Sequence, residues 1–548
     1  WVNQLNFLSD DHECSWNAPT PEDPSALYGV KGMFCAFENV LNQTFLILSN
    51  NNAIGTIPKE IGFLSSGLTR VDFDSNWLEG SLPSTIDRLH KLEILNLQDN
   101  LLGGKLPDSL TNLSNLFYFT LTKNTFTGTI SSEFINPFQS LIALHLDNNY
   151  ISGTIPDSFG NSDSLVVLRL DSNLLSGTLP GNLPDDLQAL TYFNANINRL
   201  NGTIPSSYEQ FPALSVLSVE QNYLSGTLPP ELGNISTLGY LGIGDNNIQG
   251  SIPSSFNNLS NLQGFSFPFN QVNGSLPFVE GSLPNLSLFF GDRNMLEGSL
   301  MPFRFLRNLA YLTIQSSDGG QTAGNYFTGT IPTEFCELPL VNLGLGANLL
   351  NGTIPECFGN QASLAIFAVA PNNLTGTLPT ELGLLTTLTN IDLSRNKFTG
   401  TIPSEIGLLT SLRLSGFSGN NFDGILPLTL SNLTDLTLLT LNTNKFKGTI
   451  PTEIGRLRNL QSLQFSMNDL TGKVPITLQH LTSLHTLTLD GNRFTGDLSF
   501  LCDGYFTPNF NHIISRFYAD CHNLYPEITC PCCSLCCSEE AQPYCEIP

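Results

Sequence analysis

The 548-residue sequence is poor in charge, and above all in positive charge. Charged residues make up 13% of it, against about a quarter of a typical globular protein. The 22 Lys and Arg stand against 47 Asp and Glu, a formal net charge of −25. A surface this acidic repels phosphate, and no cluster of Lys or Arg is apparent in the sequence, so we expect no binding to nucleic acid or anionic lipid. No run approaches the roughly 20 apolar residues of a membrane helix, so no direct membrane insertion is expected.

Cysteines and glycosylation sequons are present in number, and both point to an extracellular location. They favour a secreted or cell-surface glycoprotein that folds in an oxidising compartment. The sequence opens with Trp1 rather than Met, as expected of a mature product whose leader has been removed. The cysteines are Cys14, Cys35, Cys336, Cys357, Cys502, Cys521, Cys530, Cys532, Cys533, Cys536, Cys537 and Cys545. The Asn-x-Ser/Thr sequons lie at Asn42, Asn112, Asn201, Asn234, Asn258, Asn273, Asn285, Asn351, Asn373 and Asn432.

A repeat covers almost the whole chain. The tetrad Gly-x-Ile/Leu-Pro recurs nineteen times, nearly always at intervals of 24 or 25 residues, with Ser131, Met301 and Ser499 in place of the proline. Such periodicity is typical of a solenoid, in which each coil buries its apolar side against its neighbours. The anchor positions, taken at the proline or its substitute, are 58, 83, 107, 131, 156, 180, 205, 229, 253, 277, 301, 332, 355, 379, 403, 427, 451, 475 and 499.

The coil anchored at Pro403 shows what each position is expected to do. Ile391 and Leu393 should point inward from a short strand, and Asn396 should bond its amide to backbone groups of neighbouring coils. Gly400 permits a tight bend, and Pro403 fixes φ before about one turn of 3₁₀ or α helix. We therefore expect a parallel sheet on a concave side and short helical segments on a convex side.

The unit Leu388–Pro403 fits the pattern LxxLxLxxNxFxGxIP and resembles the plant-type leucine-rich repeats of receptor-like kinases, receptor-like proteins and polygalacturonase-inhibiting proteins. Cys14-Ser-Trp16 and Gly29-Val30 before Cys35 are similar to that family's amino-terminal cap, with an insertion at 17–28. This resemblance implies a Cys14–Cys35 disulfide. The Cys-rich segment 530–537 is more similar to the tails of secreted algal leucine-rich-repeat proteins. The resemblance as a whole implies binding on an extended surface, and no particular ligand.

The predicted fold is a strand-dominated α/β repeat solenoid, a right-handed leucine-rich-repeat superhelix of about 19 coils. Residues 1–44 should form a disulfide-bonded cap, 45–501 the solenoid, and 502–548 a Cys-rich carboxyl-terminal cap. Between anchors 301 and 332, a Gly/Ser-rich insert at 315–324 should leave its strand beside the concave face. It is either part of a ligand site or a tolerated surface loop.

The spacing of Cys336 and Cys357 predicts a second disulfide, because they follow consecutive anchors by four and two residues and should meet across adjacent coils. The last eight cysteines are also expected to be oxidised, in a connectivity that the sequence leaves open. Cys533 and Cys536 have a spacing that also occurs in zinc sites, but oxidation competes with metal binding in a secreted chain. No metal site is therefore predicted.

The sequons avoid one surface. Four lie five residues after an anchor, on the convex side, and three lie four residues before one, in the lateral turn. Glycans there would leave the concave sheet bare; alternatively, they follow exposed turns without functional sorting. The first group is Asn112, Asn234, Asn258 and Asn432, and the second is Asn201, Asn273 and Asn351.

The concave face should expose the residues 13, 11, 9 and 8 positions before each anchor, and these form two zones. Small residues in the second zone suggest close approach of a ligand, with aromatic rings as anchors for a peptide or a sugar; alternatively, the insert or crowded strands fill the space. The first zone, at anchors 83 to 229, is polar and mixed in charge and includes His145, Asp147, Arg169, Asp171, Tyr192 and Glu220. The second, at anchors 253 to 427, is mostly Gly, Ala and Ser with Tyr240, Phe269, Phe290 and Tyr311 among them.

Metal binding and catalysis are not expected at these positions. Asp147 and Asp171 could hold Ca²⁺ with water, or pair with Arg169 instead. His145 beside Asp147 is a combination used in acid–base chemistry, but no Ser or Cys nucleophile stands at a matching concave position. An open sheet also does not exclude water. We therefore predict no catalytic residues, no enzyme activity and no cofactor apart from N-linked glycans.

The function that these features favour is non-covalent recognition of an extracellular protein, peptide or glycan on the concave face. One alternative is a structural extracellular or cell-surface component that self-associates into a fibre or matrix. Another is an inhibitor of a secreted polysaccharide hydrolase, similar to the plant inhibitors that the repeats resemble.

Overall fold

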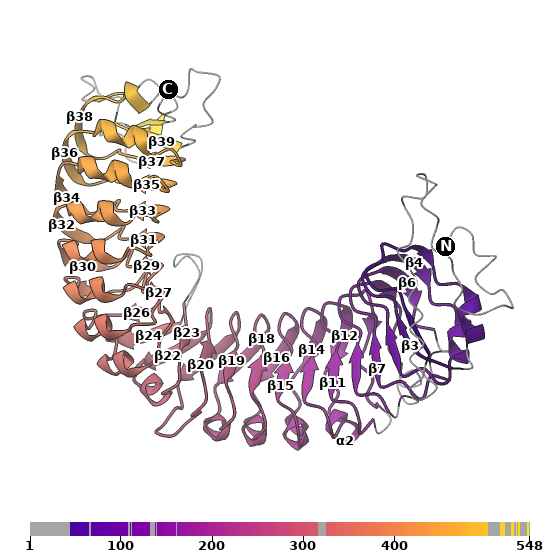
Figure 1. Cartoon of the computed structure of the whole chain (residues 1–548). Coiled ribbons are helices and arrows are strands. Elements are labelled where there is room, and N and C mark those ends of the chain that lie inside the picture. The colour runs from indigo at the N-terminus through magenta and orange to yellow at the C-terminus, as the bar shows by residue number, and fades with distance from the viewer. Residues whose placement is uncertain are drawn as a thin grey trace, which may run out of the picture. The chain divides into compact units, whose positions relative to one another are not determined.

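The computed structural model of the chain describes most of the repeat region (Figure 1). The chain divides into two compact units, Trp1–Gln271 and Val272–Pro548, and the same coil builds both. The described residues are 44–64, 67–107, 110, 112–131, 138, 140–159, 162–315, 325–501, 516–520, 528–530, 533, 535–537 and 545–546.

Three short elements form each coil, as the coil anchored at Pro403 shows. They are β29 (Asn390–Asp392), β30 (Lys397–Gly400) and the 3₁₀ helix η13 (Ser404–Leu408). Ile391 is 1% exposed and Phe398 is 0% exposed, because both point inward from their strands. One coil has too few residues to enclose a core, so it buries these side chains against the next coil. The predicted strand-dominated repeat solenoid is confirmed.

In the first unit, the first strands of successive coils pair in parallel and form the concave sheet. Their register is constant, so that Val167 pairs with Tyr192, the residue at the same distance before the next anchor. In chain order the strands are β1 (Thr44–Ile47), β3 (Leu68–Asp72), β5 (Ile94–Asn96), β7 (Tyr118–Thr120), β9 (Ala143–His145), β11 (Val167–Arg169), β13 (Tyr192–Asn194), β15 (Val216–Ser218), β17 (Tyr240–Gly242) and β19 (Gly264–Ser266).

The second unit repeats this ladder, which continues past residue 501, where the sequence predicted a cap. The proposed caps at 1–44 and 502–548 otherwise lie mostly outside the described residues, as do 316–324 of the insert. The final strand β42 (Cys545–Glu546) pairs antiparallel to β41. The parallel strands are β21 (Leu288–Phe290), β23 (Tyr311–Thr313), β25 (Asn342–Gly344), β27 (Ile366–Ala368), β29, β31 (Leu414–Gly416), β33 (Leu438–Thr440), β35 (Ser462–Gln464), β37 (Thr486–Thr488), β39 (Arg516–Ala519) and β41 (Leu535–Cys537).

A second set of strands, which the sequence analysis placed in a turn, lies on the lateral side. The glycine before each anchor bends these strands: Gly226 has φ +78°, and an added Cβ would lie 2.7 Å from Thr203 Cγ2. The lateral strands are β2 (Ile54–Thr56), β4 (Trp77–Ser81), β6 (Leu101–Lys105), β8 (Thr125–Thr127), β10 (Ser152–Gly153), β12 (Leu174–Thr178), β14 (Arg199–Gly202), β16 (Tyr223–Thr227), β18 (Asn247–Ser251), β20 (Gln271–Ser275), β22 (Met295–Ser299), β24 (Tyr326–Gly329), β26 (Leu349–Leu350), β28 (Thr375–Gly376), β30, β32 (Asn421–Ile425), β34 (Lys445–Gly448), β36 (Asp469–Lys473), β38 (Arg493–Asp497) and β40 (Ile528–Thr529).

Short helices cover the convex side, and most follow the anchor proline, as predicted. In the described part of the chain, none has the length and hydrophobicity of a membrane-spanning helix. They are η3 (Lys59–Leu64), η4 (Ser84–Arg88), α2 (Leu183–Asp186), η6 (Ser206–Gln210), η7 (Pro230–Asn234), η8 (Ser254–Asn258), η9 (Met301–Phe305), η10 (Thr333–Glu337), η11 (Glu356–Asn360), η12 (Thr380–Leu384), η13, η14 (Leu428–Asn432), η15 (Thr452–Arg456), η16 (Ile476–His480) and η17 (Ser499–Leu501).

In most described coils a buried asparagine ties the coil to its neighbours, which confirms the predicted ladder there. Asn222 Nδ2 donates to the carbonyl oxygens of Ala195 at 3.0 Å, Val219 at 3.2 Å and Glu220 at 3.1 Å. Its Oδ1 accepts from the backbone N–H of Leu200 at 2.9 Å. Each such group left without a partner in the interior would cost about 1–3 kcal/mol, so this side chain is a main support of the coil.

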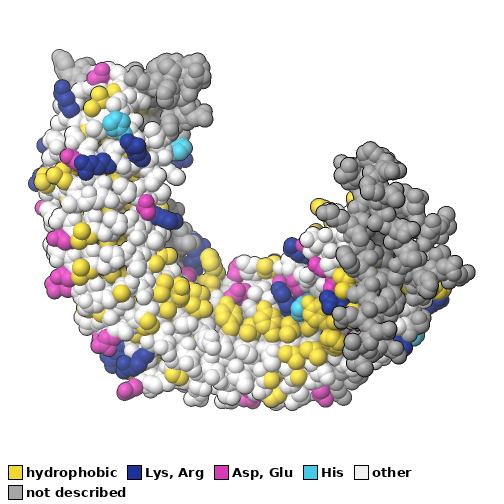
Figure 2. All heavy atoms as spheres, in the orientation of Figure 1, with side chains coloured by type: hydrophobic (Ala, Val, Ile, Leu, Met, Phe, Trp, Pro, Cys, Tyr) yellow, Lys and Arg dark blue, Asp and Glu magenta, His cyan; other side chains and the backbone are white. Residues whose placement is uncertain are grey.

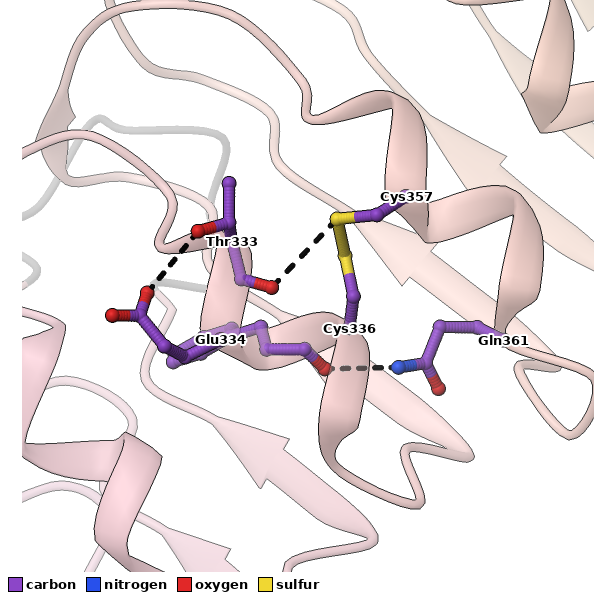
Figure 3. The surroundings of a disulfide bond; sticks show 6 residues. Thr333, Glu334, Cys336, Cys357 and Gln361 are labelled. Carbon is purple, nitrogen blue, oxygen red and sulfur yellow. Dashed lines mark hydrogen bonds between the residues drawn. A yellow bond between two sulfur atoms is a disulfide. The ribbon is translucent and has the colours of Figure 1, made fainter.

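The predicted disulfide between Cys336 and Cys357 is present and joins η10 to η11, with the two Cα atoms 5.8 Å apart (Figure 3). Gln361 Nε2 reinforces this junction by donating to the carbonyl oxygen of Phe335 at 2.9 Å. Cys530 and Cys533 also form a disulfide, so Cys533 is not free for the zinc spacing with Cys536. The remaining predicted pairs lie on residues or side chains outside those described, including Cys14–Cys35.

Candidate ligand-binding face

Seven residues at one register of the first unit form a continuous apolar row across the concave sheet. Each is the residue 13 positions before an anchor, and each pairs with the next on the neighbouring strand. With strands about 4.8 Å apart, the row extends for about 29 Å. Figure 2 shows hydrophobic side chains gathered over these strands, with charged side chains beside them. The apolar row is Ile94, Tyr118, Ala143, Val167, Tyr192, Val216 and Tyr240; all are half-exposed except Ala143, which is buried.

This row was not predicted from the sequence, because the first zone was expected to be polar. Tyr192 and Tyr240 were predicted as binding residues, but the aliphatic members Ile94, Ala143, Val167 and Val216 were not. The signal was present, since Val167 and Val216 stand at the same distance before their anchors as the tyrosines. Comparing one position across all coils would have identified it.

A row of polar residues runs beside the apolar row, two residues further along each strand. His145 pairs in register with Arg169 on the next strand, and the Tyr118 ring packs edge to face on the His145 ring with centroids 5.4 Å apart. The polar row is Asp72, Asn96, Thr120, His145, Arg169, Asn194 and Ser218.

Arg169 lies between two carboxylates, as one of the sequence alternatives predicted. Its Nε is 3.7 Å from Asp147 Oδ1 and 3.6 Å from Asp171 Oδ1. Asp147 is also held by Thr122, whose hydroxyl donates to its Oδ1 at 2.8 Å, and by Asn148 Nδ2 at 3.0 Å. Because the guanidinium stands where a Ca²⁺ ion would have to bind, this geometry favours ion pairing over calcium. The described residues contain no group of three or more acidic, His or Cys side chains placed to hold a metal.

Burial changes the ionisation of this cluster. It lowers the pKa of His145, and the positive charge of Arg169 lowers it further, while the charge of Asp147 opposes both. Burial and then the negative charge of Asp147 raise the pKa of Asp171, and Arg169 offsets this only in part. The imidazole therefore stays neutral to a lower pH than a free histidine.

Three buried polar atoms of the cluster have no hydrogen-bond partner in the described part of the chain: His145 Nε2, Arg169 Nε and Asp171 Oδ1. The two distances from Arg169 to its carboxylates exceed hydrogen-bond length. Buried polar groups normally find partners, and those without one are costly. Because these atoms are almost fully covered, a ligand or a water molecule reaches them only if the side chains of the cluster move.

Glu220 and Tyr240 lie together at the far end of the apolar row. The Tyr240 hydroxyl donates to Glu220 Oε1 at 3.4 Å, and burial together with the Glu220 charge raises the pKa of Tyr240. The space above Gly242 is filled by these side chains, since an added Cβ would lie 2.8 Å from Tyr240 Cε1 and 2.9 Å from Glu220 Oε1.

Two concave glycines of the second unit are covered in the same way. An added Cβ at Gly416 would collide with the Asp392 carboxylate, and one at Gly344 would lie 3.1 Å from Gln315 Cδ, the first residue of the insert. These glycines accommodate side chains of neighbouring coils, which agrees with the crowded-strand alternative at these positions.

The four predicted aromatic residues fall in different units. Tyr240 and Phe269 belong to the first unit, and Phe269 is 45% exposed. Phe290 and Tyr311 belong to the second, on the adjacent strands β21 and β23, and Tyr311 is 38% exposed. The two pairs are therefore described separately, each within its own unit.

The described sequon asparagines are accessible. All are exposed except Asn373, which is half-exposed, and Asn42 lies outside the described residues. Asn201 and Asn273 lie on lateral strands, and Asn234 and Asn258 end convex helices. None of those described lies in the apolar row.

Comparison with known proteins identifies the repeats. A family model described as Leucine Rich Repeat matches residues 91–113, 140–162 and 387–409. No curated protein matches the chain.

Several solved structures resemble most of the chain. The plant peptide hormone receptor RGFR1, solved in complex with RGF2, is 31% identical with a TM-score of 0.65, over 83% of this chain and 83% of that one. A TDR receptor is 31% identical with a TM-score of 0.67, over 83% of this chain and 86% of that one.

The ectodomain of the Arabidopsis thaliana membrane receptor kinase GASSHO1/SCHENGEN3, solved in complex with CASPARIAN STRIP INTEGRITY FACTOR 2, is also 31% identical, with a TM-score of 0.65. The match covers 84% of this chain and 60% of that ectodomain, so the chain spans less than two thirds of its length. The repeats, the fold and these similarities agree, and the chain belongs to the leucine-rich-repeat family.

Proposed function

We propose that the concave face of the first unit binds an extended segment of an extracellular peptide or protein. The observation that carries the proposal is the apolar row with the polar row beside it. An extended chain advances about 3.4 Å per residue, so a segment of about eight or nine residues would cover the 29 Å row. Apolar side chains of the segment would pack on the row, and its polar groups would meet the exposed parts of the polar row, such as the Arg169 side chain, which is 37% exposed.

The charge of this face favours a basic segment. Seven carboxylates and three Lys or Arg side chains occupy its outward positions, so a cationic ligand is attracted and an acidic one repelled. The carboxylates are Asp72, Asp74, Asp99, Asp147, Asp171, Glu220 and Asp245, and the cations are Arg70, Lys123 and Arg169.

The similar receptors support a ligand of this class, since two of them were solved with a bound partner and one is named a peptide hormone receptor.

We propose further that the chain is secreted or held at the cell surface and glycosylated at its accessible sequons. Its repeats are of the 24-residue GxIP type, and its Cys-rich tail is of the secreted algal type. It acts as a binding module and not as an enzyme.

Selection from a random peptide display library against the full chain tests the proposal. We expect the selected peptides to combine apolar and basic residues and to bind in a saturable manner. The double variant Val167→Lys, Val216→Lys should weaken their binding at least tenfold, because it removes apolar packing surface and places positive charge that repels a basic peptide in the middle of the row. Tyr223→Lys is the control, since Tyr223 is 60% exposed in the same unit but lies on lateral strand β16. Equal binding by the row variant and the wild type would refute the site.

The same preparation tests the other functions that the sequence suggested. Electron microscopy that shows ordered polymers would favour a self-associating structural component. Loss of activity of a polysaccharide hydrolase on mixing would favour an inhibitor, and saturable binding of a neutral oligosaccharide would favour a glycan ligand.

A further inference from the structure

A pocket of about 390 Å³ lies on the convex side of the second unit, between η15 and η16. Figure 2 shows Lys, Arg and His side chains gathered over these last coils. Folding creates this cluster, because its members come from two coils and are not a basic run in the sequence. The lining residues are Thr452, Glu453, Gly455, Arg456, Arg458, Thr477 and His480.

Close contacts join the two helices at residues that line the pocket. The Thr477 hydroxyl donates to the carbonyl oxygen of Thr452 at 2.5 Å. An added Cβ at Gly455 would collide with the Thr477 carbonyl oxygen, so the absence of a side chain allows the helices to approach. The backbone N–H of Arg458 donates to the carbonyl oxygen of Arg456 at 2.9 Å, which keeps the two arginines on one short turn.

Neither guanidinium forms an ion pair with a described residue, although the charge of Arg456 acts on the nearby Glu453 carboxylate. Among the described residues, no carboxylate oxygen lies within 4.0 Å of Arg456 or Arg458. Glu453 is the one acidic residue of the lining, and its Oε2 accepts from the Thr452 hydroxyl at 3.0 Å. Two free guanidiniums and an imidazole thus surround a hollow in a chain whose net charge is −25.

The preceding coils show that this is not a general property of the repeat. The position five residues after the anchor is Leu384, Leu408 and Asn432 in those coils, and Arg456 and His480 in the two that form the pocket. Leu384 and Leu408 are more than half exposed, so the position faces solvent in each case. Two consecutive coils therefore present donors where their neighbours present apolar or amide groups.

We propose that this pocket binds the oxyanion of an acidic saccharide, a carboxylate or a sulfate ester. Guanidinium groups form paired, charge-assisted hydrogen bonds with both kinds of oxyanion. The hydroxyl oxygens of Thr452 and Thr477 have already donated their hydrogens and still accept, which suits the hydroxyl groups of a sugar.

Other anions fit less well. No Phe, Tyr, Trp or aliphatic side chain lines the pocket, so an apolar peptide side chain finds no packing surface. Glu453 and the acidic chain as a whole oppose a ligand with several charges on one group, such as a polyphosphate. A saccharide with spaced single charges and many hydroxyl groups avoids both problems.

Calorimetric titration of the full chain at low ionic strength tests the proposal, since salt screens exposed charges. The probes are trigalacturonate, a sulfated heparin disaccharide, maltotriose, inorganic sulfate and inorganic phosphate. We expect saturable binding of at least one acidic saccharide and none of maltotriose. The two acidic probes show whether carboxylate or sulfate is preferred. Inorganic sulfate or phosphate that binds as tightly as both saccharides would overturn the saccharide assignment, and so would a lack of saturable binding by both.

The double variant Arg456→Gln, Arg458→Gln should weaken saccharide binding at least tenfold. Lys397→Gln, Lys445→Gln is the control, because it removes the same charge from exposed lateral strands of the same unit. Equal losses in both variants would mean general electrostatic attraction and would refute the pocket. Thermal unfolding of each variant checks that these exposed substitutions leave the fold intact. The peptide site lies in the other unit, so either proposal can fail alone.

Discussion

Tyr118 and His145 lie edge to face on neighbouring strands, and their contact joins the apolar row to the polar row. Arg169 follows at the same register on the next strand. The imidazole therefore has an aromatic ring on one side and a guanidinium on the other. Protonation of His145 would add a second positive charge beside Arg169, in a partly buried place.

This arrangement predicts that stability falls in mild acid. The unfolded chain binds a proton at His145 below about pH 6.5, whereas the folded chain, with its lowered pKa, does so only at a lower pH. The unfolded state binds more protons in that window, so the free energy of unfolding must decrease as the pH drops through it. Urea unfolding at pH 7.5, 6.5 and 5.5 should show a steeper decline for the wild type than for His145→Gln. Identical slopes would contradict this account.

The asparagine ladder predicts a large loss from a single amide. Asn222→Ala leaves the Leu200 N–H and several buried carbonyl groups without their partner, and should lower the free energy of unfolding by at least about 2 kcal/mol. Asn247→Ala is a suitable control, because this asparagine is exposed at the start of β18 and should change stability by less than about 0.5 kcal/mol. Similar effects of the two substitutions in urea unfolding would argue against the ladder as a main support.

The Cys336–Cys357 disulfide closes a loop with a sequence separation of 21 residues. A loop of this length should contribute about 3 kcal/mol by restricting the unfolded chain. Cys336→Ser, Cys357→Ser is therefore expected to lower the melting temperature by several degrees. A reducing agent should lower the melting temperature of the wild type by a similar amount, because it opens the same disulfide. In the double variant, the part of the effect of the reducing agent that is due to this disulfide should be absent. An unchanged melting temperature in the double variant would mean that the contact of Gln361 with Phe335 suffices at this junction.

The positions of Ile391, Asn396 and Pro403 could be predicted because every coil repeats the same environment. A period of 24 or 25 residues, seen many times, determines which residues face inward, and the parallel sheet follows from stacking. The lateral strands were not predicted because their hydrogen bonds connect different coils. Within one coil, the segment with the glycine before the anchor has the sequence features of a turn.

The ligand face was predicted less well, for a different reason. Tyr240 and Glu220 fill the space above Gly242 because of their side-chain conformations across the strands, and sequence periodicity does not specify these conformations. Arg456 and His480 line one pocket because η15 and η16 approach closely at Gly455. In both places the decisive contact joins residues of one coil to those of the next.

Replacement of Ile197 should stabilise the fold, because the backbone conformation at this residue is unfavourable for a β-branched side chain. The position eight residues before the anchor has positive φ in most described coils, and Ile197 has φ +53° while 51% exposed. A β-branched residue is disfavoured there, whereas asparagine tolerates it, as Asn148 does at the same position with φ +56°. Ile197→Asn should therefore raise the free energy of unfolding by about 1 kcal/mol.

Such strain is retained where a residue serves another purpose, and Ile197 lies on the face proposed to bind a peptide. The same substitution should weaken the binding of selected peptides while it stabilises the fold. Ser172→Asn is the control for the backbone, because Ser172 occupies the same position in the preceding coil with φ +56° and serine carries no branched side chain to relieve. A gain in stability without any loss of binding would separate Ile197 from the ligand site, and a loss of stability would show that its exposed side chain contributes contacts that outweigh the backbone cost.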